Sequence, residues 1–115
     1  MNEYMAKPLE IIDANTVLLE VDLGFNTRVP LKLRLMDIEA MRRPLNQHIK
    51  DVKVWLEEIL LLDDRNQEVL IETRREKKGD YSCLIFAMCE EKAVRRNLNM
   101  LMMQKGLATQ RKVQT

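Results

Sequence analysis

Hydrophobic and polar residues alternate along much of the first 36 residues, as they do in half-buried strands. Alternation over residues 17–21 and 29–36 predicts two strands, joined by a hairpin turn at residues 22–26 where Gly24 can adopt a positive φ. A short apolar run at residues 9–13 predicts a strand before them. Because Pro8 has no N–H for a strand ladder, we expect this strand to begin there or to lie at an edge.

The period of the pattern changes after Pro44. Apolar residues recur three or four positions apart over residues 45–60, which predicts an amphipathic helix. Strand-like segments return at residues 68–74 and 81–89, and an apolar stretch at residues 95–105 predicts a second helix that ends at Gly106. The order β-β-β-α-β-β-α is mainly β with some α. It predicts a five-stranded Greek-key barrel of the OB type with two packed helices.

Chain length predicts the number of domains, but the net charge does not indicate a binding partner. The 115 residues are enough for one domain, which we expect over residues 1–108, followed by a basic, flexible tail at residues 109–115. Nineteen Lys and Arg residues against 18 Asp and Glu residues give a net charge of +1, so the total charge indicates neither a nucleic acid nor a membrane.

Cysteine and histidine content excludes several kinds of site. Cys83 and Cys89 are too few for a disulfide framework and lack metal-ligand spacing, so we expect both to be buried as small hydrophobic residues. The single His48 excludes a multi-histidine metal site and disfavours a catalytic triad. With neither a signal-like segment nor a run of about 18 apolar residues, the sequence predicts a cytoplasmic protein without a membrane partner.

Three segments carry a family resemblance. Residues 12–16 (IDANT) match a motif that usually reads IDGDT, residues 32–42 (KLRLMDIEAMR) match one that reads RLRLxGIDAPE, and residues 97–108 match a closing helix. Together they resemble the staphylococcal-nuclease-like (thermonuclease-like) domain, especially the short single-domain members often encoded by phages. The resemblance implies an OB barrel and calcium-dependent phosphodiester hydrolysis. In that chemistry two Asp residues hold the metal, two Arg residues hold the phosphate and a Glu acts near the attacking water.

Most positions of that chemistry are substituted in this chain. Asn15 and Glu39 stand at the metal-binding Asp positions, Arg42 stands at the Glu position, and Ser82 stands near the second Arg. Only the first phosphate-binding arginine, Arg34, is retained. Because arginine cannot accept a proton from water, we expect an inactive domain with no cofactor, in which Glu39 and Arg42 pair with each other.

An enzyme with a rebuilt site is the alternative. Asp37 stands where the family has a glycine, and with Asp13 and Glu39 it would offer carboxylate oxygens to a divalent cation. The protein would then be a metal-dependent phosphodiesterase or endonuclease with Ca²⁺ or Mg²⁺ at these residues.

As an inactive domain, the protein is expected to be a binding module, and one set of residues indicates nucleic acid. The cationic and aromatic candidates are Arg34, Arg74, Arg75, Lys77, Lys78 and Tyr81. The alternatives are an ion pair of Arg34 with Asp37 or Glu39, and a solvated turn balanced by its own acidic residues Glu72, Glu76 and Asp80.

A second set of residues indicates a protein partner or a homodimer. Met100, Met102 and Met103 lie on the predicted C-terminal helix, where methionine suits adaptable contacts, and filling of the core is their alternative role. The near-neutral charge and the few aromatic residues favour a protein partner slightly over a nucleic acid.

Overall fold

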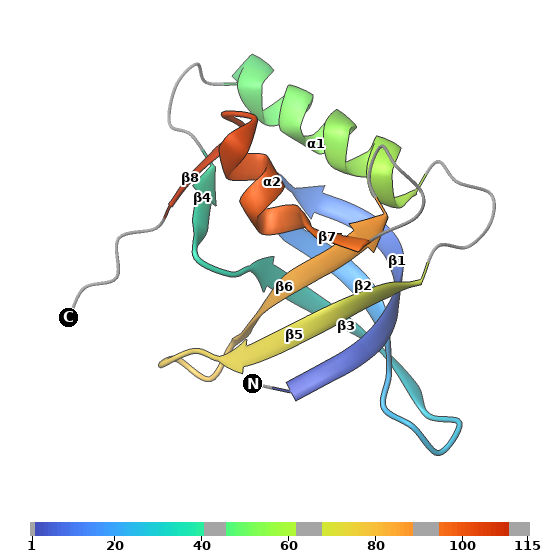
Figure 1. The fold of residues 1–115 in the computed structure, drawn as a ribbon. Helices are drawn as coiled ribbons and strands as arrows, with labels where there is room; N and C mark the ends of the chain where they lie inside the picture. Colours follow the sequence, from blue (N-terminus) through green and yellow to red (C-terminus); the bar gives the residue numbers. More distant parts are fainter. Residues whose placement is uncertain (1, 41–45, 62–67, 89–94, 111–115) are drawn as a thin grey trace.

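The computed structural model describes residues 2–40, 46–61, 68–88 and 95–110. Five strands close into a barrel and two helices pack against it (Figure 1), which confirms the predicted fold class and element order. The strands of the barrel are β1 (Asn2–Asp13), β2 (Thr16–Asp22), β3 (Arg28–Leu35), β5 (Val69–Arg75) and β6 (Tyr81–Met88). The helices are α1 (Asn46–Leu60) and α2 (Leu98–Gln104).

The strand order is that of an OB barrel. Strand β1 pairs antiparallel with both β2 and β5, β2 pairs with β3, and β5 pairs with β6. The barrel closes where β3 runs parallel to β6, through the pairs Arg34–Ser82 and Leu35–Cys83. This closure places the end of β3 beside the start of β6, although 47 residues of sequence lie between Arg34 and Ser82.

The inward positions of the barrel strands are apolar and buried, as their alternation predicts. Val17, Leu19, Ile71 and Ile85 are 0 % exposed. Helix α1 adds Val52, Leu56 and Leu60 to the same cluster, and α2 adds Leu98 and Met102. Each large side chain removed from water in this way contributes about 1.5–3 kcal/mol, so the interior of the barrel supplies the main stabilising term.

Strand β1 differs from the prediction because it begins at Asn2, before Pro8. Its first part, Asn2 to Ala6, pairs with β5, and its second part pairs with β2 across a register shift between Pro8 and Glu10. Proline is tolerated at that point because pairing with β5 has already ended and a bulge interrupts the other ladder.

The C-terminal segment also differs from the prediction. Residues Arg95–Asn97 form a short strand, β7, along β6, and α2 starts only at Leu98, where the Asn97 side chain caps the helix by accepting from the Met100 N–H. Residues Ala108–Gln110 form β8 and pair with β4 (Ile38–Ala40). The expected tail boundary after residue 108 therefore falls within a strand, while residues 111–115 lie outside the described residues.

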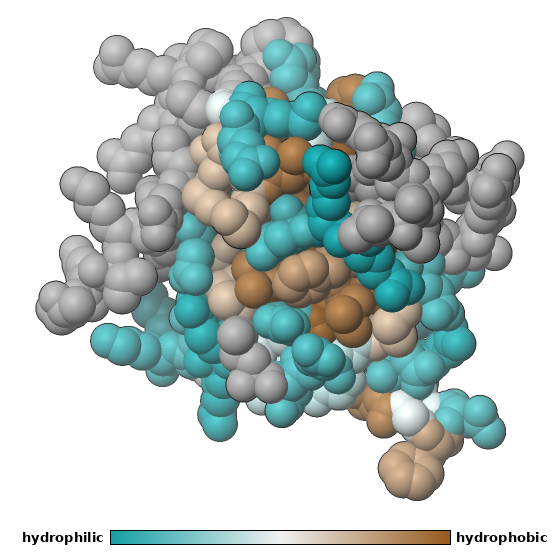
Figure 2. Space-filling model, viewed as in Figure 1, coloured by the Kyte–Doolittle hydropathy of each residue, from teal (hydrophilic) through white to brown (hydrophobic). Residues whose placement is uncertain are grey.

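Some apolar residues remain at the surface. The outward positions Leu70, Leu84 and Phe86 on β5 and β6 are half-buried, and Figure 2 shows apolar atoms ringed by hydrophilic ones on the face that displays these strands. At the tip of the β2–β3 hairpin Phe25 is 101 % exposed. Within the described residues, no helix is long and apolar enough to cross a membrane.

Candidate functional site

The candidate site lies where β3 ends and β6 begins. Thr16 pairs with Arg34, Arg34 pairs with Ser82, and Ser82 pairs with Arg74, so these residues form a row across β2, β3, β6 and β5. The Leu35 N–H donates to the Asn15 carbonyl at 2.8 Å, which attaches the β1–β2 turn to the same end of the barrel. Asn15, Arg34 and Ser82 are thus neighbours. They are three of the residues that the sequence analysis matched to metal-binding or phosphate-binding positions.

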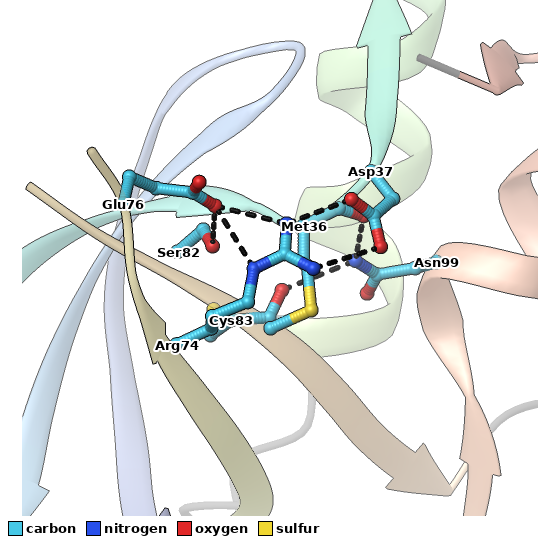
Figure 3. Close-up of polar contacts among 7 residues, drawn as sticks. All are labelled: Met36, Asp37, Arg74, Glu76, Ser82, Cys83 and Asn99. Atoms are coloured by element: carbon cyan, nitrogen blue, oxygen red, sulfur yellow. Dashed lines mark hydrogen bonds and ion pairs between the residues drawn. The ribbon is translucent and has the colours of Figure 1, made fainter. Parts of the chain in front are cut away.

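Arg74 is the centre of the polar contacts at this end (Figure 3). Its Nη2 donates to Asp37 Oδ1 at 2.7 Å and to Glu76 Oε1 at 3.0 Å. Nη1 reaches Asp37 Oδ2 at 3.4 Å, and Nε reaches Glu76 Oε1 at 3.3 Å. The hydrogen bonds to Asp37 and then to Glu76 raise the pKa of Arg74 above its usual value, so the guanidinium remains charged.

Asp37 reaches Arg74 because the backbone turns sharply after β3. Asp37 has φ 59°, a left-handed conformation that favours glycine but that Asp adopts more readily than most residues. Ser82 completes the contacts by donating from Oγ to Glu76 Oε1 at 2.5 Å. We refer to Asp37, Arg74, Glu76 and Ser82 as the Arg74 cluster. It joins the turn after β3 to the turn between β5 and β6.

A buried amide lies behind the Arg74 cluster. Asn99 of α2 is 1 % exposed, and its Nδ2 donates to the carbonyl groups of Met36 at 3.0 Å and Cys83 at 3.1 Å. Its Oδ1 accepts from the Ile85 N–H at 3.2 Å. These bonds continue the contact between β3 and β6 beyond the point where their ladder ends, so α2 helps to fix the positions of Asp37 and Ser82.

Four exposed cations lie at the same end of the barrel as the cluster. Arg34, Arg75, Lys77 and Lys78 are exposed, and none of them forms an ion pair within the part of the chain that the structure describes. Arg75 is opposite Tyr81 in the β5–β6 ladder, and Tyr81 is 50 % exposed. The surface thus combines positive charge with one accessible aromatic ring.

Unlike these cations, Arg74 is paired with carboxylates. Four of its N–H groups donate to carboxylates, which leaves one of the five for any ligand. Asp37 pairs with Arg74 and not with Arg34, its alternative partner, while the side chain of Glu39, the other alternative partner of Arg34, lies outside the described residues. Arg74 is therefore unsuited to clamp a phosphate with two parallel bonds, and its predicted contact with nucleic acid stays a prediction that the one remaining N–H could serve.

The described residues do not fit the calcium ion that the family resemblance implies. Both oxygens of Asp37 face the Arg74 guanidinium. Asn15 is uncharged and its Oδ1 accepts from Thr16 Oγ1, while Asp13 Oδ1 accepts from the Ala14 N–H. Glu39 is opposite Thr109 in the β4–β8 ladder, but its side chain and all of Arg42 lie outside the described residues, so the predicted Glu39–Arg42 pair stays a prediction.

The remaining candidates are divided between the surface and the core. Met102 is 0 % exposed and Met103 packs partly against the core, so only Met100, at 52 % exposed, presents a broad apolar surface. Met102 is thus unavailable to a partner because α2 turns that side toward the barrel. Cys83 is buried, as predicted, and burial raises the pKa of its thiol to about 12; Cys89 lies outside the described residues.

Sequence reasoning missed Asn99 and the role of Glu76. The signal for Asn99 is a polar residue on the apolar side of a helix, between Leu98 and Met102 in a segment otherwise rich in core residues.

No protein-family model matches the chain, and no curated protein matches its sequence.

Proposed function

We propose that this protein is a staphylococcal-nuclease-like domain that has lost the family's cleavage chemistry and holds single-stranded nucleic acid at the Arg34 end of its barrel. The observation that carries the proposal is that four exposed cations and the half-exposed ring of Tyr81 lie at the barrel end where β3 ends and β5 turns into β6; the cations are Arg34, Arg75, Lys77 and Lys78. Cations that follow a phosphate backbone, together with a stacking ring, suit an unpaired strand.

The placement on the fold supports the same function. OB barrels that bind oligonucleotides use the face of their second and third strands and the loops between strands one and two and between strands four and five. Here those loops are the turn at Ala14 and Asn15 and the turn between β5 and β6, and Arg34 lies on the third strand. Asp37 supports the family resemblance, because its φ of 59° occurs where the family motif has glycine.

The loss of cleavage follows from the side chains. Ser82, which stands near the position of the family's second phosphate-binding arginine, donates its hydroxyl to Glu76, and Asp37 pairs with Arg74. In other enzymes, the loss of one transition-state contact slows the chemical step by about 10²–10³-fold. A protein partner on the methionines of α2 has less support, since Met102 is in the core.

Binding and cleavage of a fluorescein-labelled single-stranded oligonucleotide test the proposal. Fluorescence anisotropy should show binding that weakens with salt, and denaturing gels with Ca²⁺, Mg²⁺ or chelator should show no shortening. Arg34→Gln or Lys78→Gln should each lower the magnitude of the log–log salt slope by about 0.7, the value per phosphate contact on single strands. The control Lys50→Gln removes an exposed charge from α1, which Figure 1 shows on the opposite side from the β5–β6 turn.

Three outcomes would contradict the proposal. Metal-dependent shortening of the oligonucleotide would favour the rebuilt nuclease site around Asp37 and Glu39. An equal loss of binding in Lys50→Gln and Arg34→Gln would show that only overall charge matters. Absence of binding at low salt would exclude the nucleic-acid function altogether.

A further inference from the structure

We propose that the nucleic-acid site continues along β3 to Lys32, so that a bound strand passes neighbouring phosphates over Arg34 and Lys32 and ends before the β2–β3 hairpin. This inference rests on the proposed function and deepens it, because it adds a phosphate contact and gives the path of the strand over the barrel. Lys32 is not among the nucleic-acid contacts predicted from sequence.

Lys32 and Arg34 lie on the same outward side of β3. The residues that alternate with them, Leu33 and Leu35, are 2 % and 3 % exposed and belong to the core. Lys32 and Arg34 are both exposed. Two residues of a strand span about 7 Å, and consecutive phosphates of an extended single strand lie about as far apart. The two cations are therefore spaced to contact neighbouring phosphates of a backbone that follows β3.

Both positive charges are available to a ligand. Within the described residues, neither Lys32 nor Arg34 forms an ion pair. In the β2–β3 ladder, Lys32 is opposite the half-buried side chain of Leu18 and Arg34 is opposite Thr16, so their partners on β2 carry no charge. A phosphate that meets these side chains has no carboxylate of the same ladder pair to displace.

Acidic residues border the two cations on two sides. On β1, Glu10 and Asp13 are exposed, and they pair with the same two β2 residues that face the cations. On β2, Glu20 and Asp22 alternate with buried residues and so take the outward side nearer the hairpin. Because carboxylates repel a phosphate backbone, the strand is kept away from β1 and from the hairpin, and its path stays over β3.

Arg28 marks where this path ends. It lies on the same outward side of β3 as Lys32, with the uncharged Pro30 between them. Its guanidinium lies 3.6 Å from Glu20 and 3.9 Å from Glu68, so its charge is shared with two carboxylates. Arg28 also adjoins the hairpin, which projects away from the β5–β6 turn (Figure 1). It is therefore outside the site and is the matched comparison for Lys32.

The salt dependence of oligonucleotide binding tests the inference with two matched variants. Lys32→Gln and Arg28→Gln each remove one exposed charge from β3, and neither residue belongs to the core. Anisotropy titrations with the fluorescein-labelled single strand should give Lys32→Gln a log–log salt slope smaller in magnitude by about 0.7. Between about 50 and 200 mM salt its affinity should then fall about three-fold less than that of the wild type. Arg28→Gln should leave the slope unchanged.

A double variant shows whether the two cations contact separate phosphates. Lys32→Gln combined with Arg34→Gln should lower the magnitude of the slope by about 1.4, because two contacts are then lost. A slope equal to that of Arg34→Gln alone would mean that both side chains meet one phosphate, and it would overturn the path along β3.

The single variants separate this inference from the proposed function. Wild-type binding with an unchanged slope in Lys32→Gln, or with equal decreases in Lys32→Gln and Arg28→Gln, would leave the nucleic-acid function intact and overturn the inference. Absence of wild-type binding at low salt would overturn the proposed function and the inference together.

Discussion

The two ends of the β2–β3 pair contain similar residues, namely a left-handed residue and an arginine near two carboxylates, but differ in the contacts that support these residues. At each end a residue other than glycine has a left-handed backbone, Phe25 with φ 53° at the hairpin and Asp37 with φ 59° after β3. At each end an arginine faces two carboxylates. Arg28 lies 3.6 Å from Glu20 and 3.9 Å from Glu68, whereas Arg74 lies 2.7 Å and 3.0 Å from its two partners.

The difference lies in what supports each end. The hairpin tip is bonded mainly to itself, through Leu23 N–H to the Thr27 carbonyl and Gly24 N–H to Asp22 Oδ1, and its aromatic side chain is fully exposed. The site end is supported by separate elements, because Arg74 bonds to Asp37 on its outer side and Asn99 bonds to Met36 and Cys83 behind it. The same residue types thus form a defined site only where tertiary contacts fix their positions.

The largest expected effect is at Asn99. Asn99→Leu leaves the buried Ile85 N–H without its partner and removes one bond from each of two carbonyl groups. Since each unsatisfied buried group costs about 1–3 kcal/mol, we expect a loss of about 3 kcal/mol in the free energy of unfolding, measured with urea. Thr27→Val, which removes an exposed side-chain bond at the hairpin, should cost less than about 0.5 kcal/mol. Equal losses would show that the two ends are supported alike.

The buried thiol behind the site predicts a dependence of stability on pH. Burial raises the pKa of Cys83 from 9.0 to about 12, so between these values the folded protein keeps a proton that the unfolded chain releases. Its contribution to stability is complete below pH 9 and is lost as the pH rises, at about 1.4 kcal/mol per pH unit. The measurement is the difference in the slope of unfolding free energy against pH between the wild type and Cys83→Ala, which isolates the contribution of this thiol. Parallel slopes would mean that the thiol is not buried.

The two arginines should differ in their coupling to carboxylates. A double-mutant cycle with Arg74→Gln and Asp37→Asn should give a coupling energy of about 1 kcal/mol between the two side chains. The value is modest because both side chains are more than a third exposed and water screens their charges. Cycles with Arg28→Gln and Glu20→Gln should give less than about 0.3 kcal/mol, since that pair is longer and lacks a short hydrogen bond. Equal coupling at the two ends would remove the distinction between them.

The sequence predicts the scaffold of the site better than its contacts. Alternation in 17–21 and 29–36 predicts β2 and β3, and the order of elements predicts the barrel that brings Arg34 beside Ser82. The pairing of Arg74 with Asp37 was not predictable, because it depends on a left-handed turn that the pattern does not encode. Asn99 was missed because an apolar helix face predicts packing, and one amide on that face does not reveal which carbonyl groups it meets.

The smallest effect concerns the left-handed residues themselves and should have opposite signs at the two ends. Glycine adopts a positive φ without the steric penalty of about 1–2 kcal/mol that other residues have there, although part of this gain is offset by the greater freedom of glycine in the unfolded chain. Phe25→Gly removes a side chain that is 101 % exposed, so we expect a net gain of about 0.5 kcal/mol. Asp37→Gly relaxes the backbone in the same way but also breaks both bonds to Arg74, so we expect a net loss. Urea unfolding measures the free energy of unfolding of both variants. If both variants are more stable than the wild type, the Arg74 cluster adds nothing to stability. If both are less stable, the exposed ring of Phe25 has a structural role.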